Sequence, residues 1–266
     1  MEILKKLTPA ETYLIKHNSN STFKELLKLT FADLCLKKVL RIEDKEVQSH
    51  PSNPIRILKY IVAGNNFQNY KPKTHELAFL NPFQKSVEIE ILFQHMIKIA
   101  RENTRNRKRY VFKALLKNPE LTDKFHKDFF TKLMGNIVMN DEGKHAKTKV
   151  DHALDKLESE LPQIIQNDKK TALEILRNIG GNIFLISGLE IELLKEIEEE
   201  LAKVLERNQD IYGYGCGGCY TSYGDNSDSF DGAFDSAGSS GSGSGCAGDS
   251  GCSGCGGCGG CGGCGS

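Results

Sequence analysis

The residues of this chain whose type and spacing best support chemistry are cysteines near its C-terminal end. Eight of the nine cysteines lie beyond residue 208, and each of the eight directly follows a glycine. Thiolates spaced as C-x-x-C bind soft metal ions such as Zn²⁺ and Cu⁺, whereas glycine offers no side chain that packs around a thiol. The spacing therefore predicts Zn or Cu ligands at Cys216, Cys219, Cys252, Cys255, Cys258, Cys261 and Cys264.

Two other uses of these thiols stay open. The Gly-Cys and Gly-Ser dipeptides resemble the core of azole-modified microcins, in which an enzyme cyclises a thiol or hydroxyl onto the preceding residue. This resemblance implies that the partner of the tail is a modifying enzyme. In the remaining interpretation the tail is an unmodified low-complexity segment. Histidine and the usual apolar residues of a zinc finger are missing around the cysteines, so bound metal is expected in exchanging clusters rather than in a defined finger.

A basic run provides the best indication of nucleic-acid binding. It consists of Arg101, Arg105, Arg107, Lys108 and Arg109. Tyr110 follows it directly, and basic side chains beside an aromatic residue suit contacts with phosphates. The expected recognition helix, near residues 30–38, offers only Lys37 and Lys38 for base contacts. Nucleic acid is therefore an alternative partner that the sequence does not favour.

The sequence contains no recognisable enzyme constellation. It has no P-loop, no dinucleotide-binding fingerprint, no nucleophile elbow and no zinc-protease motif. The seven histidines are scattered and are expected at the surface, and His75-Glu76 has no predicted catalytic partner. We therefore expect a protein that is not an enzyme.

Composition and charge divide the chain at residue 208. All 35 Lys and Arg residues and 29 of the 35 acidic residues precede residue 209, so the body carries +6 and the tail carries −6. The tail has Ile211 as its one branched aliphatic residue and is rich in glycine, serine and cysteine. Such a segment buries too little apolar surface to fold alone, which predicts disorder over 209–266. Its charge serves either weak attraction to the basic body or solubility.

The body is predicted to be mainly α-helical, with a winged-helix-like module at its start. Thr8-Pro9-Ala10-Glu11 combines an N-cap hydroxyl, an early proline and a capping-box glutamate, and Thr22 begins a second helix that contains Cys35 as a core residue. Residues 39–43 and 55–62 have strand patterns on either side of a loop at 49–54. Helices followed by a ribbon favour a winged helix, although a helical bundle with one hairpin fits the same pattern.

A weak internal repeat divides the body further. A shift of 65 positions aligns Leu14 with Phe79, Leu27 with Leu92 and Leu34 with Ile99. We expect a winged-helix-like module over 1–65, a second helical module over 66–133 and a helical C-terminal part of the body over 134–208. The second module is interpreted as a diverged repeat of the first. Further helices are expected over about 120–134, 141–166, 168–178 and 188–208.

The N-terminal residues resemble a known group of proteins. The segments 7–15 and 26–42, with sequences LTPAETYLI and LLKLTFADLCLKKVLRI, are similar to the start of an uncharacterised bacterial family of winged-helix-like helical domains that stand next to Gly/Cys-rich C-terminal tails. The resemblance implies a helical domain with a low-complexity appendage, and it implies no catalytic residues. Many members carry membrane helices, but the longest apolar run here, Ile183 to Ile186, is far shorter than a membrane span.

These observations lead to one functional expectation. The opening residues do not resemble a secretory signal, so a soluble, cytoplasmic protein is expected. We expect a binding or scaffold protein that presents its Gly/Cys-rich tail to a protein partner or to a modifying enzyme. Metal binding by the tail, azole-type modification and nucleic-acid binding by the winged-helix-like module are the alternatives.

Overall fold

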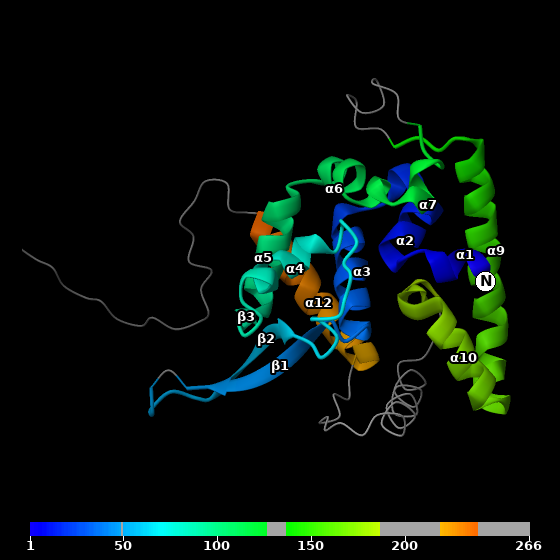
Figure 1. The fold of residues 1–266 in the computed structure, drawn as a ribbon. Coiled ribbons are helices and arrows are strands. Elements are labelled where there is room, and N and C mark those ends of the chain that lie inside the picture. Colours follow the sequence, from blue (N-terminus) through cyan, green and yellow to red (C-terminus); the bar gives the residue numbers. More distant parts are fainter. Residues whose placement is uncertain (49, 127–136, 187–218, 239–266) are drawn as a thin grey trace, which may run out of the picture.

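The fold is mainly helical, with one small sheet (Figure 1). A computed structural model describes residues 1–48, 50–126, 137–186 and 219–238. The helices are α1 (Glu2–Lys6), α2 (Pro9–His17), α3 (Phe23–Leu36), α4 (Leu77–Lys85), α5 (Phe93–Thr104), α6 (Arg107–Lys113), α7 (Pro119–Thr122), α9 (Asp141–Asn167), α10 (Lys169–Ile179) and α12 (Cys219–Gly238). Short 3₁₀ helices are η1 (Asn18–Asn20), η2 (Leu115–Lys117) and η3 (Gly180–Leu185).

The predicted helix starts are confirmed where side chains cap them. Thr8 and Glu11 form the expected capping box at the start of α2. The hydroxyl of Thr22 accepts a hydrogen bond of 3.2 Å from the backbone N–H of Glu25, at the start of α3. The side chains of Asn140 and Asp168 cap α9 and α10 in the same way. These contacts satisfy backbone donors that the first helical turn leaves without a partner.

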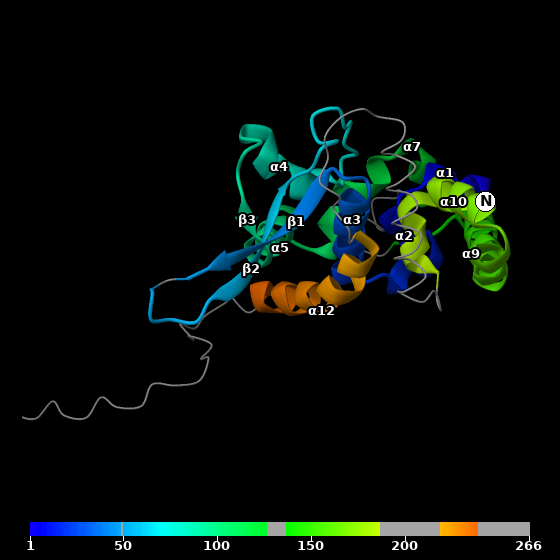
Figure 2. The ribbon, with the colours of Figure 1, turned by 90° about the horizontal axis from the view of Figure 1, so that it is seen from below.

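The sheet is built on the predicted ribbon. Strands β1 (Leu40–Val47) and β2 (Arg56–Ala63) form an antiparallel hairpin. Strand β3 (Ile91–Leu92), which the sequence analysis did not predict, pairs with β2 and gives the order β1-β2-β3. The far end of the hairpin extends away from the helices (Figures 1 and 2). The hairpin therefore joins the first predicted module to the strand that precedes α5.

One continuous core extends through all parts of the body. It includes residues from each of the predicted modules over 1–65, 66–133 and 134–208. Helix α3 lies near its centre, with every residue from Leu26 to Cys35 buried. The 3₁₀ helix η3 approaches α2 and α3 so closely that a Cβ on Gly181 would come within 2.6 Å of both Asp33 and Pro9. The buried amide of Asn182 adds hydrogen bonds to the backbone carbonyls of Leu4 and Leu7.

Two predicted helices are confirmed and a third differs. Helices α9 and α10 match the expectations for 141–166 and 168–178. The helix expected over 120–134 differs where it is described: α7 ends at Thr122, because Phe125 bridges Met139 and the His126 N–H donates to the carbonyl of Val138 at 2.9 Å. Residues 127–134 of that expectation lie outside the described residues. The helix expected over 188–208 falls outside the described residues.

The tail differs from its prediction in one part. Residues 219–238 form α12, which packs on the body, although disorder was expected throughout 209–266. The remainder of that range lies outside the described residues. Within the part of the chain that the structure describes, no helix has the length and apolar character needed to cross a membrane.

Candidate functional site

The candidate site is the surface of α3 and α5 on which α12 lies. Figure 2 shows α12 beside both helices, along the lower edge of the body in that view. Residues of α12 meet α3 in reverse order: Phe230 contacts Phe31, whereas Phe234 contacts Phe23. The two helices therefore run antiparallel. We call this surface of α3 and α5 the α12 groove.

Two phenylalanines anchor α12 in the groove. Phe230 and Phe234 are 2% and 7% exposed, and Ala233 between them is also buried. The ring centroids of Phe234 and Phe23 are 5.5 Å apart at an edge-to-face angle, and those of Phe230 and Phe31 are 6.1 Å apart. Aromatic pairs in such arrangements add to the free energy gained by removing apolar surface from water.

Charge complementarity surrounds this aromatic contact. The Lys28 ammonium lies 3.3 Å from a carboxylate oxygen of Asp231, and Lys24 lies 3.2 Å from Asp235. The side chain of Lys28 is only 9% exposed, so its pairing with Asp231 is shielded from solvent more than the outer pair. Exposed ion pairs contribute little to stability, whereas a shielded one fixes the position of its partner.

Arg101 closes the groove at the C-terminal end of α12. Its guanidinium lies over the ring of Phe234, 4.4 Å from the centroid, and donates a hydrogen bond to the Phe234 backbone carbonyl. A Cβ on Gly238 would come within 2.3 Å of the same guanidinium. Arg101 therefore combines a cation–π contact with a cap on a carbonyl near the helix end.

The sequence of α12 is a poor helix former by itself. The segment contains three glycines and several aspartates and serines, residues that disfavour helix interiors. Isolated helices of this length are marginal in water even when rich in alanine. The helical state of α12 therefore depends on its contacts with α3 and α5.

The predicted metal ligands cannot be placed. Six of the seven predicted ligands lie outside the described residues: Cys216, Cys252, Cys255, Cys258, Cys261 and Cys264. The seventh, Cys219, is the first residue of α12, and its side chain is not described. Among the side chains that are described, no three His, Cys, Asp or Glu residues are grouped as a metal site requires.

The structure separates the predicted nucleic-acid residues into two groups. Arg101 contacts α12, and Arg107 donates hydrogen bonds to the Ser21 hydroxyl and the Asn18 carbonyl at 2.9 and 2.8 Å, so both guanidinium groups hold the fold together. Arg105 is exposed at the end of α5. The last two residues, Lys108 and Arg109, lie on α6.

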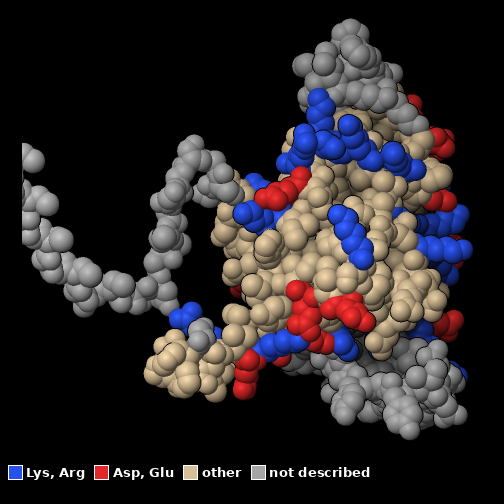
Figure 3. Space-filling model, turned by 60° about the vertical axis from the view of Figure 1, so that its left-hand side comes forward, with Lys and Arg blue, Asp and Glu red and all other residues tan. Residues whose placement is uncertain are grey.

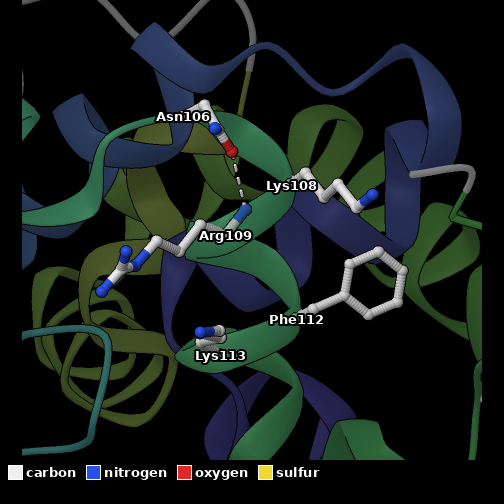
Figure 4. Close-up of a pocket in the computed structure, with 5 residues that line it drawn as sticks. All are labelled: Asn106, Lys108, Arg109, Phe112 and Lys113. Atoms are coloured by element: carbon white, nitrogen blue, oxygen red, sulfur yellow. Dashed lines mark hydrogen bonds between the residues drawn. The ribbon is translucent and has the colours of Figure 1, made fainter. Parts of the chain in front are cut away.

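Helix α6 borders a cavity with a basic lining. The cavity has a volume of about 440 Å³ and is lined by Asn106, Lys108, Arg109, Phe112 and Lys113 (Figure 4). In the close-up, Lys108 and Phe112 extend to one side of α6 and Arg109 to the other, while the Asn106 side chain accepts a hydrogen bond from the Arg109 N–H. Figure 3 shows Lys and Arg side chains gathered in a band across the upper part of one face of the molecule.

The expected recognition helix is not available to a nucleic acid. Residues 26–35 of α3 are buried in the core, and α12 lies along the helix. Lys37, one of the two expected base-reading residues, pairs with Asp33 at 2.6 Å and with Glu76 at 3.4 Å. Any contact with nucleic acid would therefore use α6 rather than α3.

His75 differs from its prediction because it is buried, with 1% exposure, and has partners. Its Nε2 lies 3.2 Å from the Thr8 hydroxyl, and its Nδ1 lies 3.9 Å from Oε1 of Glu11. Glu11 also accepts hydrogen bonds from Lys73 at 2.8 Å and from Asn118 at 2.7 Å. The other six histidines are exposed, as expected.

Burial sets the protonation of this polar cluster. Burial lowers the pKa of the His75 imidazole and outweighs the opposing effect of Glu11 and Glu76. Burial would raise the pKa of the Glu11 carboxyl, but the electrostatic influence of neighbouring His75, the charge of Lys73 and the hydrogen bonds from Lys73 and Thr8 together lower it. His75 is thus favoured as neutral and Glu11 as ionised. Their contacts join α2 to the chain around residues 73–76.

The comparisons with known proteins found no relative of this chain. Neither protein-family models, nor curated protein sequences, nor solved structures match this chain.

Sequence reasoning overlooked the α12 groove, although the sequence contained a signal for it. The tail is poor in branched aliphatic residues, and the signal lies instead in the spacing of its aromatic residues. Phe230 and Phe234 are one helical turn apart, Ala233 lies on the same face, and Asp231 and Asp235 repeat that spacing beside them. This pattern is typical of an amphipathic helix that binds a basic apolar surface.

Proposed function

We propose that this protein is a binding or scaffold protein whose helical body anchors α12 and thereby presents the cysteine-rich segment 239–266. The burial of Phe230 and Phe234 in the α12 groove is the observation that supports this proposal. It attaches the tail at a defined place, because Gly238 lies against Arg101 of α5 and the cysteine-rich sequence follows directly. Six cysteines follow Gly238 in the sequence.

The chemistry that we propose for the presented segment is soft-metal binding. Five of its cysteines recur at every third position from Cys252 to Cys264, which provides successive C-x-x-C pairs. Thiolate pairs bind Zn²⁺ and Cu⁺, and binding releases protons from the thiols. The acidic residues of α12 and Asp249 would add to the attraction for cations.

Metal titration of the reduced full-length chain tests this chemistry. We expect stoichiometric uptake of Zn²⁺ or Cu⁺ with sub-micromolar dissociation constants. A variant with serine at the six cysteines after Gly238 should lose that uptake, while a Cys35→Ser variant, altered in the core, should retain it. Absence of stoichiometric uptake by the wild type would reject the metal proposal. An intact mass lower by one water and two hydrogens per modified residue would favour azole formation instead.

A separate measurement tests anchoring. A chain that retains Cys246 as its sole cysteine would carry a spin label there, eight residues beyond Gly238. We expect the label to broaden amide signals near Arg101 on α5, and we expect Phe230→Ala/Phe234→Ala to abolish this broadening. Identical broadening in the two proteins would contradict anchoring by α12.

The α6 cavity supports a second candidate function, the binding of a phosphate-rich polymer such as RNA or DNA. Lys108, Arg109 and Lys113 supply positive charge, and Phe112 supplies an aromatic ring on the side of α6 from which Lys108 extends. Binding of a single-stranded oligonucleotide should weaken steeply with salt, and Lys108→Ala/Arg109→Ala should reduce both affinity and the salt slope. Lys144→Ala/Lys156→Ala on α9 is the matched control. Equal binding by both double variants would reject this function.

A further inference from the structure

The apolar base of the α12 groove also packs against α4 and α5 of the body. Phe31 packs against Phe79 of α4 with centroids 5.4 Å apart, and against Phe93 of α5 at 5.7 Å. These ring contacts belong to the body and fix Phe31 in position beneath Phe230. The groove is therefore a surface that α12 occupies, and its shape is set by other parts of the core.

The described side chains of α12, over 227–238, place a compact set of contacts in the groove. Among them Phe230, Ala233 and Phe234 are buried, and Asp231 and Asp235 pair with lysines at the edge. Because α12 is a poor helix former, part of the free energy of these contacts is used to order its backbone. A helix with the same contact residues on a better helix-forming sequence would bind the groove more tightly.

We infer that the α12 groove is a docking site for an acidic amphipathic helix of another protein, and that α12 is a resident occupant which that helix displaces. This inference rests on the proposed function, since displacement would release the anchor of the cysteine-rich segment. The recognised helix carries Phe at positions i and i+4, a small residue at i+3, and carboxylates at i+1 and i+5. Phe23, Phe31, Lys24, Lys28 and Arg101 recognise these positions, as they do in α12.

The chemistry of the groove favours a helix of this kind over other partners. Its buried surface is aromatic, which suits apolar anchors rather than phosphates. Its three cations lie where the carboxylates and the C-terminal carbonyls of α12 approach, and the Lys28 side chain is only 9% exposed beside Asp231. A second copy of the chain is disfavoured, because its α12 has the same poor helix-forming sequence as the tethered α12 and lacks the millimolar effective concentration of the tether, whereas a better helix former can offset that advantage.

A binding experiment with the full-length chain tests the inference. The probe is a fluorescent peptide with the sequence of residues 219–238 and serine in place of Cys219. A second peptide also carries alanine at Gly232, where a Cβ would meet no atom within 4 Å. We expect saturable anisotropy changes with Phe230→Ala/Phe234→Ala, whose own α12 is weakened, and at least about tenfold weaker binding to the wild type, where the tethered α12 competes. The Gly232→Ala peptide should bind several-fold more tightly than the first peptide.

Control peptides identify the contacts. Replacing both phenylalanines of the peptide by alanine should abolish binding, and replacing Asp231 and Asp235 by lysine should weaken it at least about fivefold. If Phe230→Ala/Phe234→Ala does not fold, full-length Asp231→Lys/Asp235→Lys replaces it, because these side chains lie at the edge of the groove. Greater binding to this variant than to the wild type is again the expected result.

Three outcomes would overturn the inference. The first is no saturable binding of the peptide to a folded variant, and the second is equal affinity of the peptide for the variant and the wild type. The third is self-association of the wild type that the peptide reverses, which would assign the groove to a second copy. The proposed function fails differently. It fails if the spin-label measurement shows no anchored tail in the wild type, whatever the peptide does. Anchoring without peptide binding would overturn the inference alone.

Discussion

Phe230 and Phe234 contribute more to the position of the tail than any charge on it. Full burial of one phenylalanine side chain is worth roughly 2–3 kcal/mol, and both rings also make aromatic contacts with α3. The exposed ion pair between Lys24 and Asp235 contributes at most about 1 kcal/mol. The charged residues around the groove therefore determine which helix fits, and the aromatic rings determine whether it stays.

Gly232 provides a test of the helical cost in α12. A Cβ at this position would meet no atom within 4 Å, so alanine fits without rearrangement. Alanine in place of glycine stabilises a helix interior by about 0.5–1 kcal/mol. We expect Gly232→Ala to slow amide hydrogen exchange in 219–238 by about two- to fivefold. Exchange in α9 serves as the internal reference and should stay unchanged. Faster exchange in α12 would contradict the open environment of Gly232.

His75 predicts a dependence of stability on pH. Its pKa is lowered in the folded protein from an ordinary value of 6.5, so below pH 6.5 the unfolded chain binds a proton that the folded chain does not. The contribution of neutral His75 to the free energy of unfolding is fully present above pH 6.5, and it decreases as the pH falls towards the folded-state pKa. The charged groups around His75 are Glu11, Glu76, Lys73 and Lys37.

Urea unfolding at pH 7.5, 6.5 and 5.5 measures this dependence. The free energy of unfolding of the wild type should include a loss of up to about 1 kcal/mol between pH 6.5 and 5.5 that His75→Gln lacks. His145→Gln, which removes an exposed histidine of α9, should retain the wild-type slope. The carboxyl of Asp33, whose pKa burial raises, acts in the opposite sense and is present in all three proteins, so it cancels from the comparison. Identical slopes for wild type and His75→Gln would refute a neutral buried His75.

At the scale of elements, local signals predicted helices well and long-range contacts poorly. The capping residues Thr8 and Thr22, and the apolar spacing in α9 and α10, are local properties. They predicted the starts of α2 and α3 and both ends of α9 and α10 nearly to the residue. The end of α7 at Thr122 and the existence of β3 depend on pairing with distant backbone, which sequence periodicity does not show. The burial of His75 likewise depends on α2, which lies far away in the sequence.

The candidate site was missed for the same reason. The helical spacing of Phe230 and Phe234 is visible in the sequence, but its meaning depends on Phe23 and Phe31, about 200 residues earlier. The basic run was predicted as one group because its members are close in sequence. The structure assigns Arg101 to the α12 groove and Arg107 to η1, since Arg101 lies on α5 and Arg107 begins α6, and the two helices meet different parts of the body.

Helix α12 is expected to detach from the body without unfolding it. Phe234→Ala removes a ring that packs on Phe23 and under Arg101, while the other ring contacts of Phe31 remain. We expect amide protection in 219–238 to fall by at least about a hundredfold, which corresponds to the roughly 3 kcal/mol typical of a buried Phe→Ala change. Protection in α9 should change little. Loss of protection throughout the body would show that α12 is an integral part of the core.

For the whole molecule, the division of charge raises the question of what holds the tail to the body. The chain carries +6 before residue 209 and −6 after it, and attraction between these parts would be screened by salt. The α12 groove combines this attraction with buried aromatic contacts, which salt does not weaken. The two contributions can therefore be separated by ionic strength.

We expect α12 to stay on the body at high salt. Between 0.05 and 1 M NaCl the screening length falls from over 10 Å to about 3 Å, which removes most long-range attraction. Protection of 219–238 against hydrogen exchange should fall by less than about tenfold in the wild type, because Phe230 and Phe234 remain buried and the Lys28–Asp231 pair is shielded. Asp231→Asn/Asp235→Asn should show a smaller salt dependence still, since it lacks both ion pairs. If salt alone exposed α12 as completely as Phe234→Ala does, electrostatic attraction rather than aromatic anchoring would hold the tail, and the aspartates rather than the phenylalanines would define what the groove recognises.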